Sequence, residues 1–264
     1  MTKLPIFQID AFTGRVFKGN PAAVVPLDSW LPDTTLQAIA AENNLSETAY
    51  FVAEGDGWRL RWFTPAVEVD LCGHATLATA HLIFSRLSTE ADRIRFQTRS
   101  GAVEVIRESG GRMALDFPAR PPQPVGDAAE LAAVAEALGK RPDALLRSTD
   151  YMAVFADEAD VAGLAPDMAR LAQLGRRGMI VTAPGRDCDF VSRFFGPGVG
   201  IPEDPVTGSA HCTLTPYWSR RLGKATLVAR QISKRGGELF CEDRGERTRI
   251  AGHAVLYLEG TIFV

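Results

Sequence analysis

The sequence lacks the features that mark several large classes of protein. It has no apolar stretch close to the roughly 20 residues that a membrane-spanning helix needs. Its formal net charge is only −3, so bulk electrostatics favours neither nucleic acid nor a membrane as a partner. The first residues show no basic segment followed by an apolar one, as a secretory signal would. We therefore expect a cytoplasmic protein.

Cysteine is scarce and widely spaced. The four cysteines form no C-x-x-C pair, and they are Cys72, Cys188, Cys212 and Cys241. Zinc sites and small disulfide frameworks rely on close, regular cysteine spacing. We therefore expect reduced thiols, no structural disulfide and no bound metal. With 46% apolar and 23% charged residues, the chain has enough hydrophobic material for a core without such supports.

The order of the expected elements indicates an α+β protein with two domains. Short segments rich in β-branched and aromatic residues predict strands, and apolar residues at helical spacing predict helices. Four prolines lie within residues 118–124, a composition that neither a helix nor a sheet interior accepts. We place the boundary there, giving domains 1–118 and 119–264, and we allow for a C-terminal strand that returns to the first domain. The strands are expected over 6–12, 22–25, 47–52, 58–63, 94–97, 102–106 and 113–117, and a helix over 32–43.

The two halves share an internal pattern. Arg61–Pro65 resembles Arg193–Pro197, and each is followed by a cluster of small residues, at 72–75 and 204–210. Each cluster precedes a helical run, expected to start near Leu77 and Cys212, and each run precedes a glycine-centred hairpin. Because both order and spacing are kept, we interpret the pattern as a duplication. Duplication predicts two similar units related by a pseudo-twofold axis, with a cleft between them.

The two small-residue clusters are candidate anion sites. Gly73 and Gly208 each stand between a strand and a helix, where backbone N–H groups and the helix dipole favour a negative charge. A glycine at such a point can also serve only to permit a tight turn. That the turn occurs twice favours binding, with a small carboxylate as the ligand.

Several side chains near these clusters are able to move or hold a proton. Glu47 precedes an apolar strand, His74 follows Gly73, and Asp204 precedes a proline. Each has a plain structural alternative, as a solvated charge, a buried histidine or a turn aspartate. Cys72 and Cys212 lie beside the clusters, although a buried cysteine more often packs than reacts.

Taken together, five ordered motifs resemble the PhzF family of phenazine-biosynthesis isomerase-like proteins. The resemblance covers nearly the whole chain, and its motifs are Phe12–Ala22, Asn44–Thr48, Phe63–Pro65, Cys72–Thr76 and Glu203–Ala210. It implies a fold similar to diaminopimelate epimerase, with two domains that each curl a β-barrel-like sheet around a central helix. It also implies no metal, no organic cofactor and commonly a homodimer.

The resemblance assigns roles to particular residues. It implies that Glu47 shuttles a proton, as the matching glutamate does on a dihydro-hydroxyanthranilate ring in phenazine-making members. It places His74 and Asp204 beside it as catalytic partners. It also matches Gly73 and Ser209 to positions of the family's motifs. We expect substrate to be bound at these two residues and at their neighbours Cys72 and Gly208. We expect all of these groups to converge on one cleft between the domains.

Cys72 departs from the phenazine-making pattern and leaves alternatives open. The predicted function is a cofactor-independent isomerase that moves a proton on a small carboxylate-bearing substrate. An amino-acid epimerase or racemase would instead use Cys72 with an opposing acid, since Asp204 stands in the second half where a second cysteine would align. A binding module that kept the fold without catalysis is the third possibility.

Overall fold

A computed structural model describes residues 1–264, and the chain folds into two compact units. The first unit comprises Met1–Asp116 together with Ala251–Val264, and the second comprises Phe117–Ile250. The change from one unit to the other thus falls next to the proline-rich segment, and the last strand belongs to the first unit. No helix is both long and apolar enough to cross a membrane.

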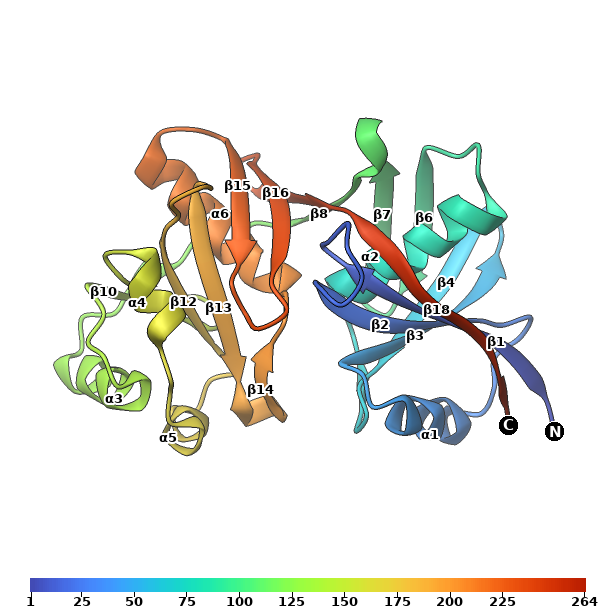
Figure 1. The fold of residues 1–264 in the computed structure, drawn as a ribbon, viewed down its shortest axis with the longest axis horizontal. Helices are drawn as coiled ribbons and strands as arrows, with labels where there is room; N and C mark the ends of the chain where they lie inside the picture. The colour runs from blue at the N-terminus through green and yellow to red at the C-terminus, as the bar shows by residue number, and fades with distance from the viewer. The chain divides into compact units, whose positions relative to one another are not determined.

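The sheet of the first unit is mostly antiparallel, with two parallel pairings (Figure 1). β18 pairs with β1 and β1 with β2; β2 and β3 run parallel, β3 and β4 antiparallel, and β4 and β6 parallel. β6, β7 and β8 then form a meander, and β5 pairs with β4. The strands are β1 (Lys3–Ala11), β2 (Asn20–Pro26), β3 (Glu47–Glu54), β4 (Gly57–Phe63), β5 (Glu68–Val69), β6 (Arg93–Thr98), β7 (Gly101–Arg107), β8 (Met113–Pro118) and β18 (Ala254–Phe263).

The central helix of the first unit is α2 (Gly73–Leu82), which continues as a π-helical turn over Ile83–Leu87. Nearly all of its side chains are buried, and it packs against β1, β2, β3 and β18. A helix that is buried all round belongs inside a core. The outer helix α1 (Asp33–Asn43) buries only Leu36, Ile39 and Ala40, so it covers the sheet from one side.

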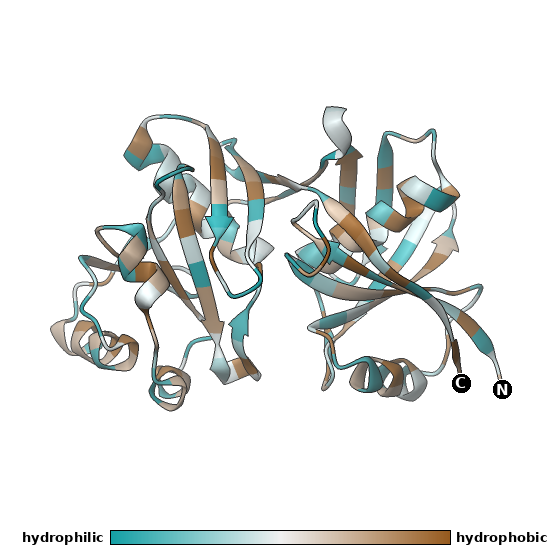
Figure 2. Ribbon diagram, viewed as in Figure 1, coloured by the Kyte–Doolittle hydropathy of each residue, from teal (hydrophilic) through white to brown (hydrophobic).

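The second unit repeats this plan. β11 and β12 run parallel, β12 and β13 antiparallel, β13 and β15 parallel, and β15 and β16 antiparallel, while β14 pairs with β13. The strands are β9 (Gln123–Pro124), β10 (Ala144–Arg147), β11 (Tyr151–Val154), β12 (Met179–Pro184), β13 (Phe190–Gly196), β14 (Ile201–Asp204), β15 (Thr226–Gln231), β16 (Gly237–Asp243) and β17 (Arg247–Gly252). Residues of β15 alternate between buried and more exposed. In Figure 2 the strand changes from brown to teal at its arrowhead, because its apolar residues come first and it ends in Arg230 and Gln231.

The central helix here is α6 (Gly208–Leu222), which packs against β15 and β16. Pro216 lies inside it and has no N–H to give to the carbonyl of Cys212, four residues earlier. The backbone N–H of Arg120 donates to that carbonyl at 2.9 Å, so the proline-rich segment supplies the missing bond. Three shorter helices cover the unit: α3 (Ala128–Leu138), α4 (Glu158–Gly163) and α5 (Met168–Gln173).

The pairings show that the two sheets correspond element by element. The series β2, β3, β4, β5, α2, β6, β7 matches β11, β12, β13, β14, α6, β15, β16, with the parallel pairs at the same places. The expected helix starts near Leu77 and Cys212 are four residues too late, because the helices begin at Gly73 and Gly208. The small residues of each cluster are therefore the first turn of a helix.

Candidate active site

In the first unit, Glu47 and His74 meet at the start of the central helix. Glu47 is the first residue of β3, and His74 is the second residue of α2. Glu47 Oε2 lies 3.1 Å from His74 Nε2, and the two side chains are only 12% and 6% exposed. A buried carboxylate is thus held against a buried imidazole.

The other ring nitrogen of His74 faces a thiol and an amide. Cys72 Sγ lies 3.5 Å and Asn20 Nδ2 lies 3.2 Å from His74 Nδ1. The turn before Asn20 depends on Gly19, which has a φ of +64°, and a Cβ there would lie 2.1 Å from the carbonyl oxygen of Ala11. Only glycine fits this turn, which carries Asn20 to the histidine.

Burial and charge act in opposite directions on this cluster. Burial alone would lower the pKa of His74, but negative charge at Cys72 and Glu47 outweighs it and raises that pKa well above 6.5. Burial raises the pKa of the Cys72 thiol, and the nearby Glu47 carboxylate adds to the effect. Cys72 and Glu47 together therefore favour the protonated imidazole.

Glu47, Cys72 and His74 also form a set of metal-ligand atoms that lie within 4.8 Å of one another. The thiol, however, lies beside Nδ1 and the carboxylate beside Nε2. The lone pairs of the two ring nitrogens point away from each other, so one ion cannot take all three ligands in this arrangement. The geometry suits a chain of proton donors and acceptors better than a metal centre.

The first turn of α2 is open to an anion. Its N-cap residue, Cys72, makes no side-chain capping bond, and the first turn carries no acidic residue. The leading N–H groups of a helix have no partner within the helix, and the dipole adds positive potential there. The backbone at Gly73 thus offers donors next to the Glu47–His74 pair.

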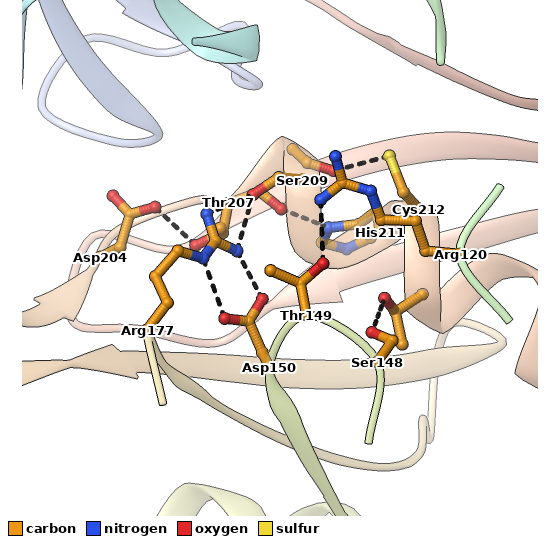
Figure 3. Close-up of polar contacts among 12 residues, drawn as sticks. Arg120, Ser148, Thr149, Asp150, Arg177, Asp204, Thr207, Ser209, His211 and Cys212 are labelled. Atoms are coloured by element: carbon orange, nitrogen blue, oxygen red, sulfur yellow. Dashed lines mark hydrogen bonds and ion pairs between the residues drawn. The ribbon is translucent and has the colours of Figure 1, made fainter. Parts of the chain in front are cut away.

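In the second unit, Asp204 belongs to a network that fixes the turn before α6 (Figure 3). The Thr207 hydroxyl donates to Asp204 Oδ2, and Gln231 Nε2 donates to the Asp204 carbonyl at 2.8 Å. The backbone N–H of Thr207 donates to Gln231 Oε1 at 2.9 Å. Because its hydroxyl is bound to Asp204, Thr207 does not cap α6, whose first turn also lacks an acid.

An arginine that the sequence reasoning did not select stands beside this turn. Arg177 Nε donates to Asp150 Oδ1 at 2.9 Å, and Nη2 pairs with Oδ2 of the same carboxylate. The guanidinium also donates to Ser209 Oγ, as Figure 3 shows. The one signal in the sequence was its place two residues before β12, close to the place that Glu47 has at the start of β3.

The structure therefore groups the predicted site residues into two sets. Cys72, Gly73 and His74 lie together with Glu47 at the start of α2. Asp204 and the first two residues of α6, Gly208 and Ser209, form the other set. The convergence of both sets on one cleft stays a prediction.

Comparisons with known proteins identify the class to which these two similar units belong. A family model described as "Phenazine biosynthesis-like protein" matches residues 9–260. An uncharacterized isomerase of Pseudomonas aeruginosa is 55% identical over 261 residues, covering 98% of each chain. A crystal structure of a PhzF-family protein from Enterococcus faecalis has a TM-score of 0.95 at 45% identity, covering 100% of both chains.

The chain belongs to the phenazine biosynthesis-like family, and it is an isomerase of PhzF type. This confirms the family read from the five motifs. A hydroxyproline epimerase from Agrobacterium vitis, solved with bound trans-4-hydroxy-L-proline, has a TM-score of 0.63 at 9% identity and covers 98% of this chain and 92% of its own. That likeness concerns the fold, and it confirms the expected α+β, epimerase-like class.

Proposed function

We propose that this isomerase moves a proton between two carbons of a small carboxylate-bearing substrate, without a cofactor, and that Glu47 carries the proton. The observation that supports this most directly is the contact between Glu47 Oε2 and His74 Nε2 at the uncapped start of α2. An acid–base group needs a defined position, and the contact with the imidazole at 3.1 Å provides it.

The two oxygens of Glu47 have different surroundings. Oε2 is turned to the imidazole, which leaves Oε1 for the substrate. In the proposed reaction Oε1 takes a proton from one carbon, the electron pair left behind shifts along the substrate, and the same carboxyl group returns the proton to a second carbon on the same face. His74 holds the carboxylate in place.

The substrate carboxylate would bind at helix N-termini. The backbone donors at Gly73 lie in the same helical turn as His74, and Gly208 with Ser209 provides a second set. These donors would also stabilise the negative charge that develops when the carbon loses its proton. Asp204 would accept a hydrogen bond from an amine or hydroxyl of the substrate.

Exchange with deuterated solvent tests the reaction class. The enzyme is incubated in D₂O with a panel of small carboxylates that includes a dihydro-hydroxyanthranilate and trans-4-hydroxy-L-proline, and loss of C–H signals is followed by ¹H NMR. We expect deuterium to enter one ring carbon of a conjugated acid, at a rate that depends on enzyme concentration. If no member of the panel takes up deuterium, the proposal of a proton-transfer isomerase fails for these substrate classes.

The contact between Cys72 Sγ and His74 Nδ1 favours a second candidate, an amino-acid epimerase or racemase. There the thiol would exchange the α-proton of an amino acid with an acid on the opposite face. The raised pKa of Cys72 argues against it, because a neutral thiol is a poor base.

Substitution of the thiol separates the two candidates. Cys72→Ala should leave the solvent exchange of the proton-transfer isomerase within a few fold of the wild-type rate. Loss of all exchange in Cys72→Ala, with deuterium entering an amino-acid α-position in the wild type, would establish the epimerase instead.

A further inference from the structure

Arg177 and Ser209 form a contact in the second unit that the proposed chemistry has not used. Arg177 Nη1 and Nη2 lie 3.3 Å and 3.2 Å from Ser209 Oγ. The guanidinium is fixed from behind by the carboxylate of Asp150, whose side chain is 2% exposed, and it lies over the ring of Phe194 with 5.3 Å to the ring centroid. Figure 3 shows the three side chains in this order, with Asp150, Arg177 and Ser209 linked by dashed lines.

This arrangement determines where the hydroxyl hydrogen of Ser209 points. A serine hydroxyl has one hydrogen to donate and two lone pairs that accept. Both contacts from Arg177 are donations into Oγ, because a guanidinium has no acceptor. The O–H is therefore turned away from Arg177, and the neighbouring positive charge makes it a stronger donor.

The duplicated fold gives Arg177 and Ser209 the same places as the pair in the other unit. Ser209 is the second residue of α6, as His74 is the second residue of α2. Arg177 lies in the loop that leads into β12, just as Glu47 stands where the matching strand β3 begins. In each unit, a charged side chain at or just before a strand contacts the second residue of the central helix. Glu47 contacts His74 in one unit. Arg177 contacts Ser209 in the other.

From these contacts we infer that Arg177, anchored by Asp150, is a positioning residue that aims the Ser209 hydroxyl at an anionic group of the ligand. The ligand class is a small carboxylate, bound by this O–H together with backbone N–H groups of the first turn of α6, which no side chain caps. The inference rests on the proposed function only in taking Ser209 as a substrate-binding residue. It adds that Ser209 binds through a donated hydrogen bond whose direction another residue sets.

Binding of benzoate, a carboxylate that the enzyme does not need to turn over, tests this directly. Benzoate is titrated into ¹⁵N-labelled full-length protein, and the dissociation constant is taken from the amide shifts of Gly208 and Ser209. Ser209→Ala and Arg177→Met should each weaken binding roughly 10-fold, the scale for a hydrogen bond to a charged group. The double variant should bind no more weakly than Ser209→Ala, because Arg177 acts only through the hydroxyl.

Three further variants keep the test independent of folding and of simple charge loss. Asp150→Asn combined with Arg177→Met removes the buried carboxylate that Arg177→Met alone would leave unpaired, and it should bind benzoate as weakly as Arg177→Met. Arg176→Met removes the same charge from the same loop, where Arg176 lies over the Tyr151 ring at 5.5 Å, and it should bind as the wild type does. Arg177→Lys keeps the charge without the planar fork, so it should not restore binding.

Several results would overturn the inference. They are additive losses in the double variant, wild-type binding in Arg177→Lys or Ser209→Ala, and the absence of benzoate shifts at Gly208 and Ser209 in the wild type. None of these outcomes depends on turnover, so they stay separate from the solvent-exchange test of the proposed function.

Discussion

At the scale of single residues, the proposed proton transfer by Glu47 depends on an imidazole that lies between a carboxylate and a thiol. His74 contacts Glu47 through Nε2 and Cys72 through Nδ1, with both partners buried. Desolvation disfavours the charged ring, and the carboxylate at 3.1 Å favours it. The pKa of His74 is raised because Cys72 and Glu47 together outweigh burial.

This balance predicts how His74 titrates. The imidazole should stay protonated above pH 6.5 in the folded protein, and Glu47→Gln should lower its pKa because the attracting charge is removed. The stabilisation from the pair is complete below the unfolded pKa near 6.5, and it is lost as the pH rises through the folded value. Side-chain ¹⁵N NMR of the histidine follows the titration. A His74 pKa unchanged by Glu47→Gln would show that the carboxylate does not hold the proton.

The buried His211 should give the free energy of unfolding the opposite dependence on pH. Burial lowers its pKa to about 4, and Nδ1 lies 2.9 Å from the carbonyl oxygen of Thr207. The unfolded chain binds a proton at this residue below about pH 6.5 while the folded chain does not, so the free energy of unfolding should fall by about 3 kcal/mol between pH 6.5 and 4. Urea unfolding at several pH values measures this free energy. His211→Asn keeps a donor to Thr207 and should flatten the dependence; an equally steep fall in that variant would place its source elsewhere.

At the scale of elements, the helix starts are the part that the sequence predicted least well. The expected starts were late because neither Cys72 nor Thr207 makes a side-chain cap, and glycine is a poor helix former. The missing caps follow from the proposed role, since a capped first turn would have its donors occupied. The strands expected in the first half were predicted within a few residues, because alternating burial, as in β6 and β7, leaves a clear pattern of period 2. No expected strand covered β10 to β14 of the second unit.

The end of α1 affects how the chain reaches Glu47. Asn44 is the C-cap in the left-handed region, with a φ of 49°, and its N–H donates to the carbonyl of Ala40. Asn44→Ala should lower the free energy of unfolding by about 1 kcal/mol, because alanine is strained at positive φ, and Asn44→Gly should keep or raise it. Chemical denaturation measures the free energy of unfolding of both variants, and both lack the asparagine amide group. Equal stability of the alanine and glycine variants would show that backbone strain at this cap does not matter.

At the scale of the whole molecule, a duplicated plan carries two different clusters. The series of strands around the central helix follows the same order in both units, and the repeated motifs made this visible in the sequence. The side chains at equivalent places differ, with a carboxylate and imidazole in one unit and a guanidinium and hydroxyl in the other. Arg177 and Asp150 escaped the sequence reasoning because their pairing joins residues 27 apart through the fold and leaves no local motif.

The most direct measurement of the central claim is the rate of solvent exchange in Glu47→Gln. The substitution keeps the size of the side chain and removes its capacity to take a proton. Glu54→Gln is the matched control, at the exposed end of the same strand. The account predicts that Glu47→Gln retains carboxylate binding and loses about 10²–10⁴-fold in exchange rate, while Glu54→Gln exchanges at the wild-type rate. Exchange by Glu47→Gln at the wild-type rate would contradict it.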